Sequence, residues 1–257
     1  MARAVKLEFN KRRLRGFTGN QLKLMACFCM LCDHIGYILI ENGVLYGRNA
    51  DYWALALATE EGQRWYLFAR ILRAIGRISF PIFAFMLVEG FLHTRNLRGY
   101  MRNMLLFALI SEVPFDLGCY QVAFNPGYQN IGFTLFLGLL SMWLMKKTAR
   151  ISGVLQLLCA GAVCGLAQLI HCDYGAFGVG LISVLWLLRK DSSARLIVGA
   201  VMAALDGLSY YCTEALAFLP LRFYNGKRGT APLKFFFYAF YPLHLLLFYA
   251  MVYFGNR

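Results

Sequence analysis

The stretch LKLMACFCMLCDHIGYILI at residues 22–40 decides the fold class of this chain. A helix needs about 20 mostly apolar residues to cross the hydrocarbon core of a membrane. Residues 22–40 reach about that length, and Lys23, Asp33 and His34 are the strongly polar side chains within it. The stretch therefore predicts a membrane-spanning helix.

Seven further apolar stretches predict that the chain is all-α, a polytopic integral membrane helical bundle. They cover residues 71–92, 104–120, 131–145, 154–170, 174–188, 196–221 and 235–254. The stretch at 196–221 contains Asp206, Gly207 and Glu214, so it forms either one long helix or two short ones. We therefore expect about eight or nine transmembrane segments.

The composition excludes an ordinary soluble domain. Of the 257 residues, 60% are hydrophobic and only 15% are charged, whereas a soluble domain has about 25% charged residues. The mean hydropathy is +0.54. Aromatic residues make up 16% of the chain, which suits aromatic belts at the two membrane interfaces.

The net charge of +13 comes mainly from short basic runs between the apolar stretches. These runs lie at residues 11–15, 95–102, 146–150, 189–195 and 227–234. Basic loops of membrane proteins stay in the cytoplasm, so the pattern predicts a multi-pass protein of the inner (cytoplasmic) membrane with a cytoplasmic N-terminus. Membrane lipid is the expected surrounding, and no nucleic-acid partner is expected. A single span over 196–221 would place Lys227 and Arg228 outside, which favours a broken, re-entrant or paired segment there.

The domain organisation is simple. Residues 1–20 are expected to form a basic cytoplasmic segment, because they lack the apolar core and cleavage site of a signal peptide. Residues 21–257 are expected to form a single transmembrane domain. Most of the eight cysteines lie in apolar stretches, and no second Cys/His pair completes a zinc site with Cys29 and Cys32. We therefore expect no metal.

Lys23 and His34 are the first candidate pair of functional residues. They are eleven positions apart, which places them on one face of a helix and about 16 Å apart along its axis. Lys23 would lie at the cytoplasmic mouth and His34 beyond the middle of the membrane, with Asp33 beside it. A lone membrane histidine is often a packing residue, but this pairing favours a base at the end of a channel for a long ligand with an anionic end.

Charged residues also interrupt the next two apolar stretches. Arg73 and Arg77 lie in the second stretch, and Glu112 and Asp116 lie four apart in the third. Buried charges are costly in a membrane and are functional candidates, although structural ion pairs are an equal alternative. We expect an antiparallel hairpin to set these arginines level with the two carboxylates, leaving surplus arginine to bind an anion.

Other polar residues at the ends of the apolar stretches complete the expected polar network, for substrate binding or structure. They are Glu89, His93, Arg95, Asp173, Tyr174, Tyr241 and His244. The loop Asn225, Gly226, Lys227 and Arg228 concentrates glycine and positive charge, and it either cradles a phosphate or is a tight basic turn.

Several of these blocks together resemble one known family. The blocks are residues 22–36, 73–96, 173–175, 224–229 and 235–244. They are similar to the TraX family, which is named for the protein that N-acetylates conjugative F-type pilin, and the resemblance runs from about residue 18 to 250. TraX proteins in turn distantly resemble the acyltransferase-3 superfamily, whose members carry a basic residue, ten others and then an essential histidine. Lys23 and His34 fit this spacing, with Lys where the superfamily often has Arg.

The resemblance implies a membrane acetyltransferase. The acetyl group would pass from cytoplasmic acetyl-CoA to an acceptor at or across the membrane, either a pilin N-terminal amine or an envelope glycan. By analogy, His34 would be the base or acyl relay, and Lys23 with the loop at 225–228 would meet the CoA phosphates. Asp33, next to His34, is the second candidate catalytic residue. For the oxyanion of the reaction, Tyr37, Arg77 and Tyr241 are equivalent candidates from sequence alone.

Two other functions remain open from the sequence. A transporter could use the same buried charges as a substrate path, but transporters often contain internal repeats and none is visible here. A non-catalytic scaffold for envelope assembly would not need so many charges within the membrane. The acetyltransferase is therefore the expected function.

Overall fold

The computed structural model describes residues 16–255, and within this range the chain is helical apart from turns, loops and two isolated bridges. Most of the predicted basic segment 1–20, including the run at 11–15, lies outside the described residues. The all-α prediction is confirmed for the described part of the chain.

The first apolar stretch forms one long helix in two conformations. Helix α2 (Gly19–His34) begins at a capping box in which Thr18 accepts a hydrogen bond from the backbone of Gln21 and the Gln21 side chain accepts one in return. The helix continues without interruption as the π-helix η1 (Ile35–Val44). π-helical turns are often found at functional sites, and here the change occurs directly after His34.

The segment at 42–69, between the first two apolar stretches, is largely helical. It contains α3 (Ala50–Leu57) and most of α4 (Glu60–Gly76), and the chain continues after a break at Arg77 and Ile78 into α5 (Ser79–His93). Helix α4 packs along α2 and η1. It approaches closely because Gly76 faces Asp33: a Cβ on Gly76 would lie 2.2 Å from the Asp33 Cβ.

Four helices follow in the middle of the chain, and the C-terminal part is more irregular. The four are α6 (Leu97–Tyr120), α7 (Ile131–Thr148), α8 (Gly153–Leu169) and α9 (Gly175–Leu187). They are followed by α10 (Ser192–Asp206), the 3₁₀ turns η2 (Gly207–Tyr210) and η3 (Thr213–Ala217), α11 (Phe218–Arg222) and α12 (Lys234–Gly255). The segment 196–221 is therefore broken, as favoured above, and the break occurs where Tyr211 and Cys212 both adopt a φ of 58°.

Within residues 16–255, four helical stretches are long and apolar enough to cross a membrane. They are Gly19–Val44, Glu60–His93, Ser192–Tyr210 and Lys234–Gly255, and α8 and α9 are shorter apolar helices. These lengths and compositions indicate a membrane protein. The count of eight or nine segments and the cytoplasmic N-terminus stay predictions.

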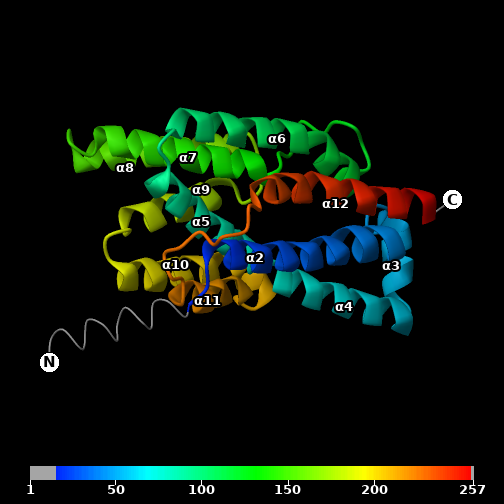
Figure 1. The fold of residues 1–257 in the computed structure, drawn as a ribbon. Helices are drawn as coiled ribbons and strands as arrows, with labels where there is room; N and C mark the ends of the chain where they lie inside the picture. The colour runs from blue at the N-terminus through cyan, green and yellow to red at the C-terminus, as the bar shows by residue number, and fades with distance from the viewer. Residues whose placement is uncertain (1–15, 256–257) are drawn as a thin grey trace, which may run out of the picture.

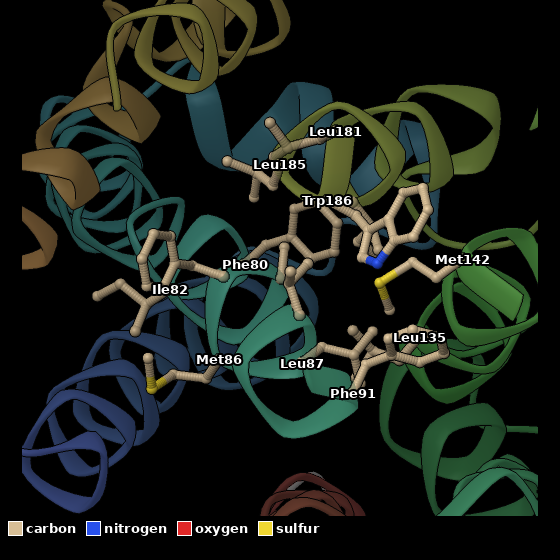
Figure 2. Close-up of a cluster of buried hydrophobic side chains, with 14 of the residues drawn as sticks. Phe80, Ile82, Met86, Leu87, Phe91, Leu135, Met142, Leu181, Leu185 and Trp186 are labelled. Atoms are coloured by element: carbon tan, nitrogen blue, oxygen red, sulfur yellow. The ribbon is translucent and has the colours of Figure 1, made fainter. Parts of the chain in front are cut away.

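Helix α5 lies at the centre of the bundle. In Figure 1, α12 lies between α6 on one side and α2 on the other, in agreement with its contacts to both. Figure 2 shows Phe80, Leu87 and Phe91 of α5 directed toward Met142 of α7 and Trp186 of α9. These side chains belong to the largest buried cluster of the protein. One side of α5 is thus fixed by packing, which holds its other side in place.

We expect Gly76→Ala to destabilise the protein by about 1–3 kcal/mol, because overpacking would push α4 away from α2. Gly161→Ala in α8 is the matched control, since a Cβ there meets nothing within 4 Å. Thermal unfolding in detergent measures both variants. Equal melting temperatures would contradict the close approach of α4 and α2.

Candidate functional site

A cavity of about 620 Å³ is enclosed mainly by α2, α5, α6 and α12. This volume lies within the usual range for small-molecule sites. Each helix contributes residues at helical spacing, such as Tyr100, Asn103 and Phe107 from α6. Helices α5 and α6 are consecutive in the chain, but their main neighbours differ. Helix α5 packs mainly on α2 and α9, whereas α6 packs mainly on α7 and α12. The space between them is the cavity.

The cytoplasmic mouth predicted from the sequence corresponds to a cationic end of this cavity. Lys23, Arg228 and Lys234 line it, and the Lys23 ammonium lies 5.4 Å from the centre of the Phe237 ring. Because Lys23 and His34 line the same cavity, the structure brings together the pair that the sequence predicted on one helix face.

The loop at 225–228 is held against the start of α2 by hydrogen bonds. The backbone amides of Gly19 and Asn20 donate to the carbonyls of Lys227 and Arg228, both at 2.8 Å. These two amides are therefore occupied by protein, and the attraction for an anion comes from side chains.

The four predicted loop residues do not have the same surroundings. Gly226 and Arg228 line the cavity, whereas Asn225 and Lys227 lie outside its lining. The Asn225 side chain shapes the loop: its Nδ2 donates to the Gly16 carbonyl at 2.8 Å and its Oδ1 accepts from the Lys227 amide at 2.9 Å. The loop is thus a basic turn that presents one cation, Arg228, to the cavity.

At the other end of the cavity, His34 is hydrogen-bonded to His244. The distance between His34 Nδ1 and His244 Nε2 is 2.6 Å, and His244 Nδ1 lies 2.6 Å from the Phe240 carbonyl oxygen. A carbonyl oxygen only accepts, so His244 Nδ1 carries a hydrogen. In neutral His244, Nε2 is then the acceptor, and His34 Nδ1–H donates to it. His34 Nε2 is left with a free lone pair.

The predicted companion Asp33 lies in a different environment from the His34 ring. Its carboxylate lies 3.9 Å from Arg73 Nε, and Arg73 Nη1 also lies 3.3 Å from Glu41 Oε2. The hydrogen-bonded partner of His34 is His244, from the last helix. Asp33 lines the same cavity, and a catalytic part for it stays a prediction.

The predicted pairing of the arginines with Glu112 and Asp116 is wrong. Helix α6 packs on α7 and α12 rather than on α4. Glu112 accepts hydrogen bonds from the backbone and side chain of Asn130, and Asp116 accepts one from the Asn125 amide at 2.7 Å. Both carboxylates therefore anchor the loop between α6 and α7.

Tyr174 and Asp173 extend the site at the His34 end. Tyr174 begins α9 with a φ of 60°, its ring stacks on Phe80 with centroids 3.9 Å apart, and its hydroxyl accepts from Arg77 Nη1 at 3.4 Å. A left-handed backbone at a non-glycine residue is strained and is often found at functional sites. Asp173 precedes α9 and accepts a hydrogen bond from the Tyr128 hydroxyl at 3.1 Å. Burial raises the pKa of the Asp173 carboxyl to about 6, although the nearby Arg77 opposes this.

The remaining predicted residues lie near the mouth or support the histidines. Glu89 lines the cavity and pairs with Arg195 of α10 at 2.7 Å, while His93 Nδ1 lies 2.8 Å from the Glu89 carbonyl oxygen. Arg95 is exposed and lies outside the lining. Tyr241 is buried, lines the cavity and packs on His34 with ring centroids 6.0 Å apart.

Sequence reasoning missed several residues of the site. Arg195 belongs to the basic run at 189–195, yet it lies in the first turn of α10 and its side chain is buried. Tyr210 was not considered, although its ring lies 4.1 Å from the guanidinium of Arg70 and 4.5 Å from that of Arg77. One signal in the sequence could have identified Tyr100, Asn103 and Tyr238. Each lies three or four residues from another polar or aromatic position on its helix, and therefore on the same helix face. Among residues 16–255, no cluster of His, Cys, Asp and Glu side chains could hold a metal ion.

The hydrogen-bond chain predicts the tautomer of His34. In protein with ¹⁵N-labelled histidine, we expect His34 and His244 both to have Nδ1 protonated and Nε2 unprotonated, and the His34 signal is assigned through its loss in His34→Ala. The exposed His171 is the reference signal. A His34 ring protonated at Nε2 and not at Nδ1 would contradict the arrangement.

Comparison with known proteins identifies relatives of this chain. A sequence model of the TraX protein family matches residues 18–252, a range that includes all the site residues described above. A probable fimbrial assembly protein, FimC of serogroup H1 from Dichelobacter nodosus, is 28% identical over 255 residues. The match covers 90% of this chain and 94% of that protein. No solved structure matches this chain.

Proposed function

This chain belongs to the TraX family, and we propose that it is a membrane acetyltransferase that moves an acetyl group from cytoplasmic acetyl-CoA to an acceptor at or across the membrane. The observation that carries the proposal is one cavity with cations at one end and, at the other, His34 with its Nδ1 hydrogen-bonded to His244. The spacing of Lys23 and His34 also resembles that of the acyltransferase-3 superfamily.

The donor would lie along the length of the cavity. Its phosphates would meet Lys23, Arg228 and Lys234, because cationic side chains form strong charge-assisted hydrogen bonds with phosphate. The distance of about 16 Å along α2 from Lys23 to His34 suits an extended arm that ends in a thioester. The reactive carbonyl carbon would then lie beside His34.

His34 would act as a general base. Its Nε2 would take a proton from the acceptor amine or hydroxyl while that group attacks the thioester carbonyl. The carbon–sulfur bond would then break. The departing sulfur would take that proton from His34 and leave as the thiol of CoA. Positioned acid–base groups typically contribute about 10²–10⁴-fold to a rate. His244 would stabilise the imidazolium by accepting from its Nδ1–H, because the Phe240 carbonyl keeps the His244 lone pair directed at His34.

Tyr174 and Tyr241 are the best placed donors for the developing oxyanion. Both line the cavity, whereas Tyr37 lines a smaller pocket of about 340 Å³. The Tyr174 hydroxyl accepts from Arg77, which leaves its own hydrogen available and makes it a stronger donor. Donors directed at the developing charge are usually a large part of catalysis.

The acceptor is proposed from the relatives. One relative is named as a probable fimbrial assembly protein, which supports a pilin N-terminal amine, with an envelope glycan as the other acceptor class. The same name supports a second candidate, a non-catalytic role in fimbrial assembly. In either case, the proposed location is the inner membrane, with several passes and a cytoplasmic N-terminus.

We expect His34→Ala to reduce acetyl transfer by about 10²–10⁴-fold, because the general base is removed. Transfer of radiolabelled acetyl from acetyl-CoA to membrane fractions of the host measures the effect. His171→Ala is the matched control, because His171 is exposed and lies outside the cavity lining. Full activity in folded His34→Ala protein would reject the role of His34.

The proposed donor site is tested with Lys23 and with the two neighbouring cations of the loop, Lys227 and Arg228, of which only Arg228 lines the cavity. We expect Arg228→Ala and Lys23→Ala each to weaken acetyl-CoA binding by about 10–100-fold, because a hydrogen bond to a charged group contributes about 1.5–3 kcal/mol. Lys23→Arg keeps the charge and should be mild, and Lys227→Ala should bind like the wild type. Calorimetry in detergent measures the dissociation constants. Equal losses in Lys227→Ala and Arg228→Ala would show that only the overall charge of the loop matters.

A further inference from the structure

We propose that Tyr100, Asn103 and Tyr238, together called the polar belt, form a subsite that binds the amide groups of the donor. The inference rests on the proposed function and assigns these three residues to the pantetheine arm of acetyl-CoA. The inference rests on the position of these three neutral polar side chains, which lie between the cationic mouth and the deeper apolar wall of the cavity.

The depth of the polar belt follows from the helices that carry it. Tyr100 and Asn103 lie about 4.5 Å and 9 Å along α6 from its first residue, and Tyr238 lies about 6 Å along α12 from Lys234. Helix α12 begins at the cationic end, because its first residue, Lys234, lines the mouth, and α6 packs along α12. Deeper in the cavity, the lining becomes apolar at Phe83 and Phe107 before it reaches His34. The belt is thus one to two turns inside the mouth.

Within residues 16–255, the three side chains of the belt form no hydrogen bond with protein groups, although all three face the cavity. Polar groups removed from bulk water are nearly always hydrogen-bonded. Two other polar groups that line the cavity are bonded to protein, Glu89 to Arg195 and His34 to His244. The half-buried side chains of the belt therefore keep their hydrogen-bonding capacity for a ligand in the cavity.

The belt is held in place by close packing. The Tyr100 hydroxyl lies against Gly90 of α5, where a Cβ would come within 2.8 Å of the hydroxyl oxygen. The Tyr238 ring packs edge-on against Phe107, with centroids 5.7 Å apart. A rigid subsite loses little conformational freedom when it binds its ligand.

The chemistry of the belt favours amides over charged groups or a plain acyl chain. A carboxamide and two phenols provide both donors and acceptors without net charge, and an amide needs both kinds. A phosphate would prefer the cations at the mouth, and an alkyl chain would leave three polar groups unsatisfied. From one end to the other, the cavity therefore offers charge, neutral hydrogen bonding and a base, which is the order of phosphates, amides and thioester in acetyl-CoA.

The test measures by calorimetry how tightly two ligands bind to the full-length protein in detergent. Acetyl-CoA contains the arm, and adenosine 3′,5′-bisphosphate lacks it. The variants are Tyr100→Phe, Tyr238→Phe and Asn103→Leu, which keep the size of each side chain. Tyr211→Phe is the control, because the Tyr211 side chain is exposed and outside the cavity.

We expect each belt variant to weaken acetyl-CoA binding by about threefold to tenfold, the usual contribution of one hydrogen bond, with unchanged binding of the bisphosphate. Unchanged acetyl-CoA binding in all three variants would overturn the belt while leaving the acetyltransferase proposal intact. Equal weakening of both ligands would also overturn it, because the residues would then only maintain the shape of the cavity. Wild-type protein that binds the bisphosphate but not acetyl-CoA would overturn the subsite and the proposed donor together.

Discussion

A polar group inside a membrane protein cannot rely on bulk water, so it needs a partner from the protein or from a ligand. This constraint sorts the many polar residues of the chain into two groups. Glu112, Asp116 and Glu89 have protein partners, and they hold loops and helices together. Within residues 16–255, Tyr100, Asn103 and Tyr238 line the cavity and form no side-chain hydrogen bond with protein. The lack of a protein partner thus distinguishes the proposed ligand-binding residues from these three carboxylates.

Helix α5 connects the stability of the protein to its site. Residues such as Leu87 and Phe91 pack in the largest buried cluster, and others such as Phe83 and Glu89 line the cavity. Phe80 belongs to both, since it is buried in the cluster and stacks on Tyr174 beside the cavity. A site that depends on a distance of a few ångströms between side chains needs such rigid support. The cost of the arrangement is concentrated at Tyr174, whose left-handed backbone is tolerated because Phe80 and Arg77 hold its side chain.

The hydrogen bond between His34 and His244 fixes how the His34 ring is presented to the cavity. A histidine without a partner could present either ring nitrogen to the cavity. The chain from the Phe240 carbonyl through His244 to His34 selects one tautomer and one ring orientation. This is the same principle by which a second group orients the catalytic histidine of many unrelated sites. The partner here is another histidine rather than a carboxylate, which avoids a buried negative charge beside the ring.

The basic pair Lys227 and Arg228 only favoured a break in 196–221, whereas the sequence by itself determined the helical membrane class and the shared face of Lys23 and His34. These features depend on apolar run length and helical periodicity, which are local properties of the chain. Only the tertiary structure decided that His34 meets His244, that Arg73 meets Glu41 and that Glu112 meets Asn130. The expectation that Glu112 lies opposite the arginines depended on the assumption that consecutive helices pack as neighbours. Which helices pack together depends instead on close approaches such as that at Gly76 and on the fit of many side chains at once, and no periodicity along the chain encodes that fit.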